Sequence, residues 1–343
     1  MAARPTIADL ARMAGVSVAT VDRVLNGRHK VREETARQVY DAAASIGYHA
    51  MGLLRQRVFE DLPQYKLGFL LQKPHQPFYQ AVTREIESAA LAAPGVRIIP
   101  QIDYNTSTAP AALTEKLKAM AGRNQAVAMV SPDHPAVTAA VEELREKGIP
   151  VFSLLSDFAS GVREGYVGLN NRMVGRTAAW MIAKAARKPG KVATFIGSHR
   201  FHGHELREIG FRSYFRENAP EFEVLDTLVN LDTAEITHEA TINLLQRHPD
   251  LIGFYVCGGG MEGAISAIRE ENLHGKLLVV VNELTPDSRA ALADDVVTLA
   301  ISTPVATLSR TLIDLMIGAI DRGLSDVPGQ TFLPFDLYTP ENI

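Results

Sequence analysis

The chain has 343 residues, which is too long for one ordinary domain and predicts two or three. A hydrophobic content of 46% and a charged content of 22% are typical of a soluble globular protein with a sizeable core. The single cysteine, Cys257, excludes an intrachain disulfide framework. No apolar run reaches the roughly 18 residues of a membrane span, and the N-terminus lacks a secretory signal. We therefore expect a cytoplasmic protein with no membrane partner.

The charge is unevenly distributed along the chain. The formal net charge is −4, yet residues 1–60 carry nine Arg and Lys against six Asp and Glu. That segment is therefore +3, and the remainder is −7. A basic head on an acidic body suits a head that meets phosphate groups, although the asymmetry is modest.

Residues 6–26 predict two short helices joined by a tight turn. Thr6 and Asp9 have the spacing of a capping box, Gly15 breaks the first helix, and Ser17 can cap the second. A third helix is predicted at about 33–46. Apolar residues at helical spacing predict one small shared core. They are Ile7, Leu10, Ala11, Ala14, Val21, Val24, Leu25, Ala36, Val39, Ala43 and Ile46.

The strings in this segment narrow the choice between a plain three-helix bundle and a DNA-binding helix-turn-helix. IADLA (7–11), AGVSVATV (14–21), RVLN (23–26), VREET (31–35) and GY (47–48) resemble the DNA-binding head of the lactose-repressor (LacI/GalR) family. The resemblance covers residues 6–48. It implies that the second helix enters the major groove of double-stranded operator DNA.

Residue roles carry over by position from this resemblance. Val18 and Ala19 stand where the family reads base edges, and Arg23 is a further base contact, since a guanidinium suits the two acceptors of guanine. Ser17, Thr20 and Asn26 would touch phosphates. Asp22 departs from the family pattern, which usually has serine there. This carboxylate could pair with Arg23 or accept from a cytosine amine.

The linker after Tyr48 departs further from the family, which commonly has Pro-Asn and then a hinge helix whose leucine wedges into the minor groove. Counting from Tyr48 places Arg57 at the wedge position. Leu53 or Leu54 could serve in a shifted register, Arg55 and Arg57 could read a narrow minor groove, or the segment could be an ordinary linker helix. The expected DNA-contacting set is Thr6, Ser17, Val18, Ala19, Thr20, Asp22, Arg23, Asn26, Leu53, Leu54 and Arg57.

From residue 66 the chain alternates strands and helices, which predicts an α/β body of parallel sheets with helices on both faces. Strands are expected at 66–71, 96–102, 126–130, 151–154, 165–168, 191–196, 223–229, 253–256, 277–281 and 298–302. Helices are expected at 78–92, 109–122, 135–147, 172–187, 204–218, 234–248, 261–271, 287–294 and 305–322. Two rounds of similar size predict two lobes.

This body resembles the periplasmic-binding-protein-like module that follows the head throughout the same family. The order of elements and the strings Gln76-Pro77-Phe78-Tyr79 and Asn170–Gly175 carry the resemblance. It implies a head at 1–49, a hinge at 50–64 and a ligand-binding domain at 65–343. Lobe one would hold about 65–165 and 303–328, and lobe two about 166–302 and 329–343. The chain would cross between the lobes near 165, 302 and 328.

A ligand is expected in the crevice at the carboxyl ends of the strands. In sugar-binding relatives an aromatic pair stacks on the sugar ring, and Phe78 and Tyr79 match its place. A carboxylate near Glu283 typically takes paired sugar hydroxyls. The expected ligand-binding set is Gln76, Phe78, Tyr79, Asp103, Asp157, Asn171, His202, Glu205, Gly259, Glu283 and Ser302.

Two departures bear on the ligand. Glu205 replaces an arginine common among relatives, and the glycines 258–260 replace the usual polar residues. More acid and less arginine favour a sugar or polyol, with an amino sugar or another amine as the alternative. The triplet could also cradle a phosphate, but it lacks the residues of a P-loop, so close backbone approach or a simple turn is preferred.

Two more specific sites, a zinc site and a catalytic cysteine, can also be considered from the sequence. His199, His202, His204 and Glu205 crowd one loop and are zinc-type ligands, but their spacing favours hydrogen bonding or helix capping. Cys257 ends a buried strand without an activating partner, which favours a structural thiol over a nucleophile. We expect no metal and no cofactor.

Together these features predict a ligand-controlled DNA-binding transcriptional regulator, most simply a repressor, that acts as a homodimer on a pseudo-palindromic operator. A solute receptor feeding a transporter is the first alternative, but it leaves the head without a role and needs an export signal. An enzyme that uses the crevice histidines and Glu205 as acid and base is the second. Binding without turnover would separate the regulator from the enzyme.

Overall fold

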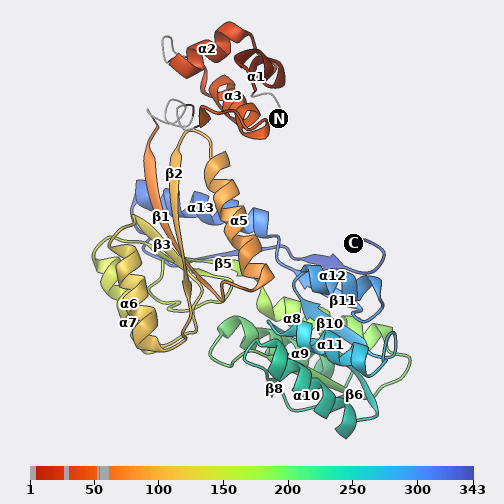
Figure 1. Cartoon of the computed structure of the whole chain (residues 1–343). Coiled ribbons are helices and arrows are strands. Elements are labelled where there is room, and N and C mark those ends of the chain that lie inside the picture. The colour runs from red at the N-terminus through yellow and green to blue at the C-terminus, as the bar shows by residue number, and fades with distance from the viewer. Residues whose placement is uncertain (1–4, 27–30, 52–53, 55–61) are drawn as a thin grey trace. The chain divides into compact units, whose positions relative to one another are not determined.

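The computed structural model describes residues 5–26, 31–51, 54 and 62–343 (Figure 1). The chain divides into two compact units: an N-terminal unit of residues 1–65 with 91–99, and a body of residues 66–90 and 100–343. None of the helices in these described ranges is long and apolar enough to cross a membrane.

The described part of the N-terminal unit includes the helices α1 (Ile7–Met13), α2 (Val18–Asn26) and α3 (Glu33–Ser45). The predicted capping box is confirmed, because Thr6 Oγ1 accepts from Asp9 N at 3.2 Å while Asp9 Oδ2 accepts from Thr6 N at 3.0 Å. Gly15 adopts a φ of 63° after α1, and Ser17 Oγ accepts from Thr20 N at 3.1 Å at the start of α2. The turn and both caps therefore follow from residues identified in the sequence.

The three helices pack around one small apolar core that includes Leu10, Val21 and Val39, each with no exposed surface. Leu54 belongs to the same core and is also 0% exposed. Its prediction as a minor-groove wedge is therefore wrong for this conformation, because its side chain is occupied in packing. The other two predicted hinge contacts, Leu53 and Arg57, lie outside the described residues.

Lobe one of the body is built on a six-stranded sheet of order β12-β5-β4-β3-β1-β2. Helices α5, α6, α7 and α13 accompany it (Figure 1). The strands are β1 (Gln64–Gln72), β2 (Arg97–Asn105), β3 (Ala126–Met129), β4 (Val151–Leu154), β5 (Gly165–Leu169) and β12 (Gly329–Leu333). The helices are α5 (Pro77–Ala92), α6 (Pro110–Ala121), α7 (Pro135–Glu146) and α13 (Val305–Arg322).

Lobe two has a sheet of order β13-β11-β10-β9-β6-β7, and β8 also pairs with β6. Every pairing recorded in it is parallel except that of β13 with β11. The strands are β6 (Lys191–Ile196), β7 (Glu223–Val224), β8 (Leu228–Val229), β9 (Leu251–Val256), β10 (Leu278–Asn282), β11 (Leu299–Ser302) and β13 (Asp336–Tyr338). The helices are α8 (Asn171–Ala185), α9 (His202–Asn218), α10 (Ala234–Arg247), α11 (Met261–Glu270) and α12 (Pro286–Ala293).

The predicted lobe boundaries need correction by one strand at two of the three crossings. β5 pairs with β4 and β12 pairs with β5, so both strands belong to lobe one rather than lobe two. The chain therefore crosses after β5, after β11 and after β12. The short buried strand β5 suits either sheet, and β12 lacks the apolar pattern of a core strand, so hydrogen-bond pairing alone assigns them.

Candidate functional site

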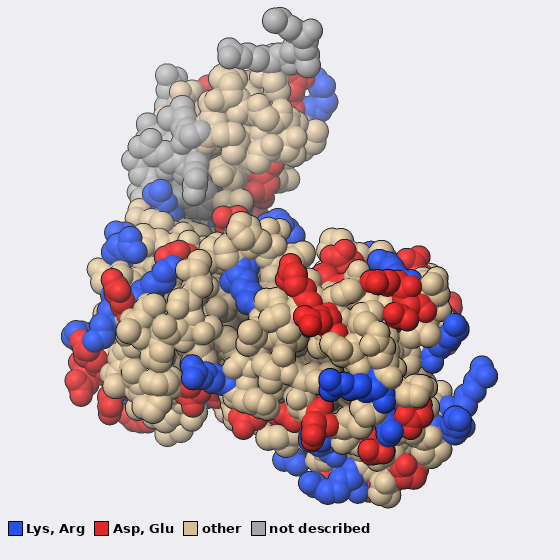
Figure 2. Space-filling model, turned by 60° about the horizontal axis from the view of Figure 1, so that its bottom comes forward, with Lys and Arg blue, Asp and Glu red and all other residues tan. Residues whose placement is uncertain are grey.

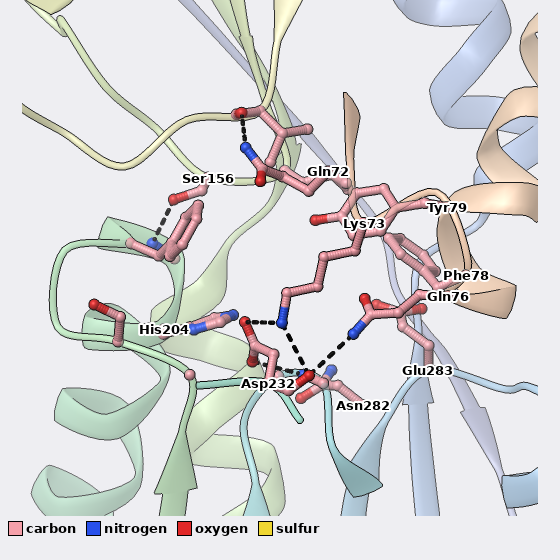
Figure 3. A pocket seen from close by; sticks show the side chains of 18 of the residues that line it. Gln72, Lys73, Gln76, Phe78, Tyr79, Ser156, His204, Asp232, Asn282 and Glu283 are labelled. Carbon is pink, nitrogen blue, oxygen red and sulfur yellow. Dashed lines mark hydrogen bonds and ion pairs between the residues drawn. The ribbon is translucent and has the colours of Figure 1, made fainter. Parts of the chain in front are cut away.

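A cavity of about 490 Å³ lies between the two lobes, at the carboxyl ends of their strands (Figure 3). This volume suits a small-molecule ligand. Lobe one contributes Gln72, Lys73, Gln76, Phe78, Tyr79 and Ser156 to the lining. Lobe two contributes His204, Arg207, Asp232, Gly258, Gly259, Asn282 and Glu283, among others. Five residues of the predicted set therefore line it: Gln76, Phe78, Tyr79, Gly259 and Glu283.

Phe78 and Tyr79 form the aromatic part of the wall. They open α5, and their ring centroids are 5.3 Å apart at an interplanar angle of 68°. Burial raises the pKa of Tyr79 far above its usual range, and Asp232 adds to the effect. The phenol is therefore a neutral hydrogen-bond donor beside an apolar ring, which is an arrangement suited to the mixed surface of a sugar.

Glu283 is the most firmly held carboxylate of the cavity. It accepts hydrogen bonds from Ser302 Oγ at 3.1 Å, Thr303 N at 2.6 Å and Thr303 Oγ1 at 2.8 Å. Its backbone φ is 105°, in a region that non-glycine residues adopt only when the surroundings hold them there. Burial raises its pKa, against the opposing effect of Arg207 and these donors. The predicted ligand residue Ser302 does not line the cavity and instead positions Glu283.

Asp232, in the turn after β8, is a cavity carboxylate that sequence reasoning missed. Its Oδ1 accepts from Gly259 N at 2.9 Å. A Cβ at Gly258 would lie 2.6 Å from the same oxygen, and one at Gly197 would collide with both carboxylate oxygens. The glycines at 258 and 259 thus make room for an acidic side chain of the protein itself. Asp232 lies shortly before α10 in the sequence. An acidic residue at such a place is usually interpreted as a helix cap, so its position in the cavity is not evident from the sequence.

Arg207, on α9, is the second functional residue that the sequence did not reveal. It is 8% exposed and lines the cavity. Its Nε donates to Asn171 Oδ1 at 2.7 Å and its Nη1 to the carbonyl of Cys257 at 2.5 Å. Glu205 does stand in place of the arginine common among relatives, but Arg207, two residues later, brings a guanidinium into the cavity that the sequence argument for an arginine-poor pocket left out. Asn171 was predicted to bind ligand, but it is absent from the lining and positions the guanidinium.

The histidine-rich loop does not form the predicted ligand contacts. His202 Nδ1 lies 3.2 Å from Glu205 Oε2, and neither residue lines the cavity. His204 does line it. Burial lowers its pKa, so the ring is neutral, and its Nδ1 is buried without a hydrogen-bond partner. Within the described ranges, no group of three or more His, Cys, Asp or Glu side chains could hold a metal ion.

Asp103 and Asp157 also need correction, because both pair with nearby cations away from the cavity. Asp103 Oδ2 lies 3.5 Å from Lys116 Nζ, near the end of the edge strand β2. Asp157 accepts from Arg163 Nε at 2.5 Å and from Arg163 Nη2 at 2.7 Å. Burial alone would raise the pKa of Asp157, but hydrogen bonds from Arg163 and Ser153 hold it below its usual range.

One prediction follows for the glycines around Asp232. Gly258→Ala should weaken ligand binding about 5- to 150-fold, because the new Cβ displaces the Asp232 carboxylate and His204, and overpacking of this kind costs about 1–3 kcal/mol. Isothermal titration calorimetry measures the affinity. Gly161→Ala is the matched control, since nothing lies within 4 Å of its Cβ position. Equal affinities in the two variants would contradict this role for Gly258.

The second candidate surface is α2 of the N-terminal unit. Val18 is 52% exposed, and Ser17, Ala19, Arg23 and Asn26 are exposed as well. The predicted contacts Thr6 and Thr20 have their hydroxyls engaged locally, with Asp9 and Ser17 respectively.

In the free protein Asp22 bonds to Asn26 rather than to Arg23, and its contact with a cytosine amine stays a prediction. Its Oδ1 accepts from Asn26 Nδ2 at 2.7 Å, one turn further along α2. The bond places the Asp22 carboxylate next to Asn26, the residue predicted to contact a phosphate. Elsewhere, on the face that Figure 2 shows, Lys and Arg are interspersed with Asp and Glu over the body.

A helix-turn-helix unit joined to a two-lobed body with a ligand-sized cleft defines a ligand-responsive DNA-binding regulator. Comparison with known proteins agrees. Residues 6–50 match the model of bacterial regulatory proteins of the lacI family, and residues 67–324 match a periplasmic binding protein domain. The chain belongs to this family of lacI-type transcriptional regulators with a periplasmic-binding-protein-like body.

Individual relatives are similar along nearly the whole chain. The HTH-type transcriptional regulator MalR of Streptomyces coelicolor is 27% identical over 98% of this chain and 94% of its own length. The sucrose operon repressor of Streptococcus mutans is 22% identical over 98% and 99%. Among solved structures, the glucose-galactose binding protein GanP of Geobacillus stearothermophilus has a TM-score of 0.73 at 17% identity, over 82% of this chain and 99% of that one. This last likeness concerns the fold alone.

Proposed function

We propose that the protein is a homodimeric repressor whose effector is an uncharged sugar or polyol, bound in the cavity between the lobes. The charge balance of the cavity carries this proposal. Three cations, Lys73, Arg200 and Arg207, line it together with three carboxylates, Asp232, Glu262 and Glu283. An anionic ligand would lie among carboxylates that the existing cations only balance.

The bonds of two of these three cations strengthen the argument. Lys73 donates to two backbone carbonyls, and Arg207 is bound by Asn171 and the carbonyl of Cys257. Neither is an unpaired cation waiting for a phosphate or carboxylate. An aromatic pair and the Glu283 carboxylate remain for a hydroxyl-rich ring. The relative named as a sucrose operon repressor supports the same class of effector.

A thermal-shift screen tests the effector class. Neutral sugars and polyols, amino sugars, sugar acids and sugar phosphates are compared on the full-length protein. A ligand at 100 times its dissociation constant stabilises by about 2.7 kcal/mol, so a cognate effector is readily detected. We expect the best compound to be neutral. A sugar phosphate or sugar acid as the best compound would reject the proposed class.

Effector binding is proposed to change the affinity of the protein for its operator DNA. Two heads on one homodimer would contact two half-sites of a pseudo-palindrome, and effector binding would shift the lobes and hence the spacing of the heads. A coupling free energy of about 1–3 kcal/mol changes operator affinity roughly 5- to 150-fold. Electrophoretic mobility shifts with and without the effector measure this factor.

A prediction for Arg23 tests the head separately. Arg23→Ala should weaken binding to the operator by about 1–3 kcal/mol, because one bidentate contact to a base is lost, and should leave effector affinity nearly unchanged. Arg12→Ala is the control, since Arg12 is an exposed arginine of α1 paired with Asp9 at 3.5 Å. Equal losses on operator and random duplex in Arg23→Ala would contradict a base-reading role.

A further inference from the structure

A cluster of oxygens from lobe two surrounds one ammonium group from lobe one inside the cavity (Figure 3). Lys73 Nζ donates to the carbonyl of Leu231 at 2.7 Å and to the carbonyl of Asp232 at 2.9 Å. The Asp232 Oδ2 atom lies 4.0 Å away. Gln76, three residues after Lys73, also donates from Nε2 to the Asp232 carbonyl at 3.1 Å. Protein groups of the two lobes are therefore joined directly across the cavity.

The turn that presents these oxygens is held in an unusual conformation. Leu231 and Asp232 both have a φ of 53°, which places two consecutive non-glycine residues in the left-handed region. Such residues persist where their surroundings hold them, and they cluster at ligand clamps. Asn230 supplies part of this support. It is fully buried, its Oδ1 accepts from Asp232 N at 2.9 Å, and its Nδ2 donates to the Gly259 carbonyl at 2.9 Å.

The side chain of Asp232 is fixed by a second, independent feature. Gly197 and Gly258 leave the space that its carboxylate fills, and Gly259 N donates to Oδ1. The other oxygen, Oδ2, is the one on the side of Lys73. Backbone and side chain of the same turn thus offer their acceptors to a single cation, with the two carbonyls closer to it than the carboxylate.

We propose that the Leu231–Asp232 turn is an ammonium-binding subsite of the effector cavity, and that Lys73 of the opposite lobe is its built-in occupant. The subsite takes a primary alkylammonium group. Insertion of Lys73 draws lobe one onto lobe two before any effector arrives, and the effector occupies the rest of the cavity beside this pair. The inference depends on the proposed function only in treating the cavity as the effector site.

The distance between the lobes in the absence of sugar tests the proposal. Donor and acceptor dyes are placed on Ala119→Cys in lobe one and Glu271→Cys in lobe two of the full-length protein, both exposed positions. Lys73→Met keeps the bulk of the side chain and removes the ammonium. We expect a lower energy-transfer efficiency than in the parent. Lys118→Met is the matched control, because the Lys118 ammonium pairs with Glu143 within lobe one.

Chemical rescue separates an ammonium subsite from a general packing effect. Lys73→Ala removes the equivalent of n-propylammonium, and millimolar n-propylammonium should restore the parental efficiency, while n-propanol should not. Asp232→Asn should lower the efficiency less than Lys73→Met, since both carbonyl acceptors remain. Unchanged efficiency in Lys73→Met, or equal restoration by amine and alcohol, would overturn the proposal.

These measurements use no sugar and no DNA. A negative sugar screen alongside a lower efficiency in Lys73→Met would reject the proposed effector class and support the subsite. A positive screen with unchanged efficiency in Lys73→Met would support the proposed effector class and reject the subsite. The thermal midpoint of each variant, compared with that of Lys118→Met, confirms that it is folded.

Discussion

Replacing Arg163 by methionine is expected to lower the free energy of unfolding by about 3–5 kcal/mol, because it leaves a carboxylate with little exposed surface without its cation. Arg163 is 1% exposed and holds both oxygens of Asp157. Its Nη1 also donates to the Gly329 carbonyl at 2.8 Å, which ties the start of β12 to the segment before β5. Urea denaturation monitored by circular dichroism measures the loss.

Two further variants show whether the unpaired charge causes this loss. Arg163→Met combined with Asp157→Leu removes both charges and should recover much of the stability, since an apolar pair can replace a buried ion pair. Lys118→Met removes one member of an exposed pair and should change stability little. A double variant no more stable than Arg163→Met would locate the effect in packing or in the bond to Gly329 instead.

The location of Asp157 illustrates why the site was only partly predictable. The carboxyl ends of parallel strands identify a region of the fold, and the sequence places Asp157 just after β4, where a ligand residue is expected. Whether such a side chain turns into the cavity depends on partners from elsewhere in the chain. Here a buried arginine six residues later takes the carboxylate, and sequence spacing does not reveal that pairing.

The places of Phe78, Tyr79 and Glu283 in the cavity lining were predictable from strand ends together with the family resemblance. The aromatic pair begins α5 directly after β1, so the helix start points both residues at the crevice. Asp232 was not predictable in this way. Its carboxylate enters the cavity because glycines at 197 and 258, from two other strand ends, leave room for it. The sequence shows that these two positions are glycine, but it does not show which side chain fills the space beside them.

Most helices and strands were recognisable, since alternation of buried strands and amphipathic helices is a local signal. The elements that escaped are β12 and β13. Most residues of β12 are at least partly exposed, as are all of β13, so neither carries the apolar pattern of a core strand. Their pairing with β5 and β11 is a long-range property of the fold. The pairing of β12 with β5 moves the predicted lobe boundary, whereas β13 lies in lobe two as expected.

Glu283→Gln should weaken effector binding roughly 10- to 150-fold, because a hydrogen bond to a charged acceptor contributes about 1.5–3 kcal/mol. The amide keeps the size of the side chain and one acceptor for Thr303, so the fold should be retained. Isothermal titration calorimetry with the compound found in the sugar screen measures the change. Asp103→Asn is the control, since Asp103 does not line the cavity. An unchanged affinity would remove Glu283 from the ligand site.

The same variant has an expected effect on the pH dependence of stability. Burial raises the folded-state pKa of Glu283 above its ordinary value of 4.5. Between these two pKa values the folded protein binds the proton more tightly than the unfolded chain, so Glu283 makes stability fall as pH rises through this interval. Above the raised pKa the buried charge opposes folding in full. The thermal midpoint of Glu283→Gln relative to the parent should therefore increase from pH 4.5 to neutral pH, whereas a constant difference would show that folding leaves the pKa of Glu283 unchanged.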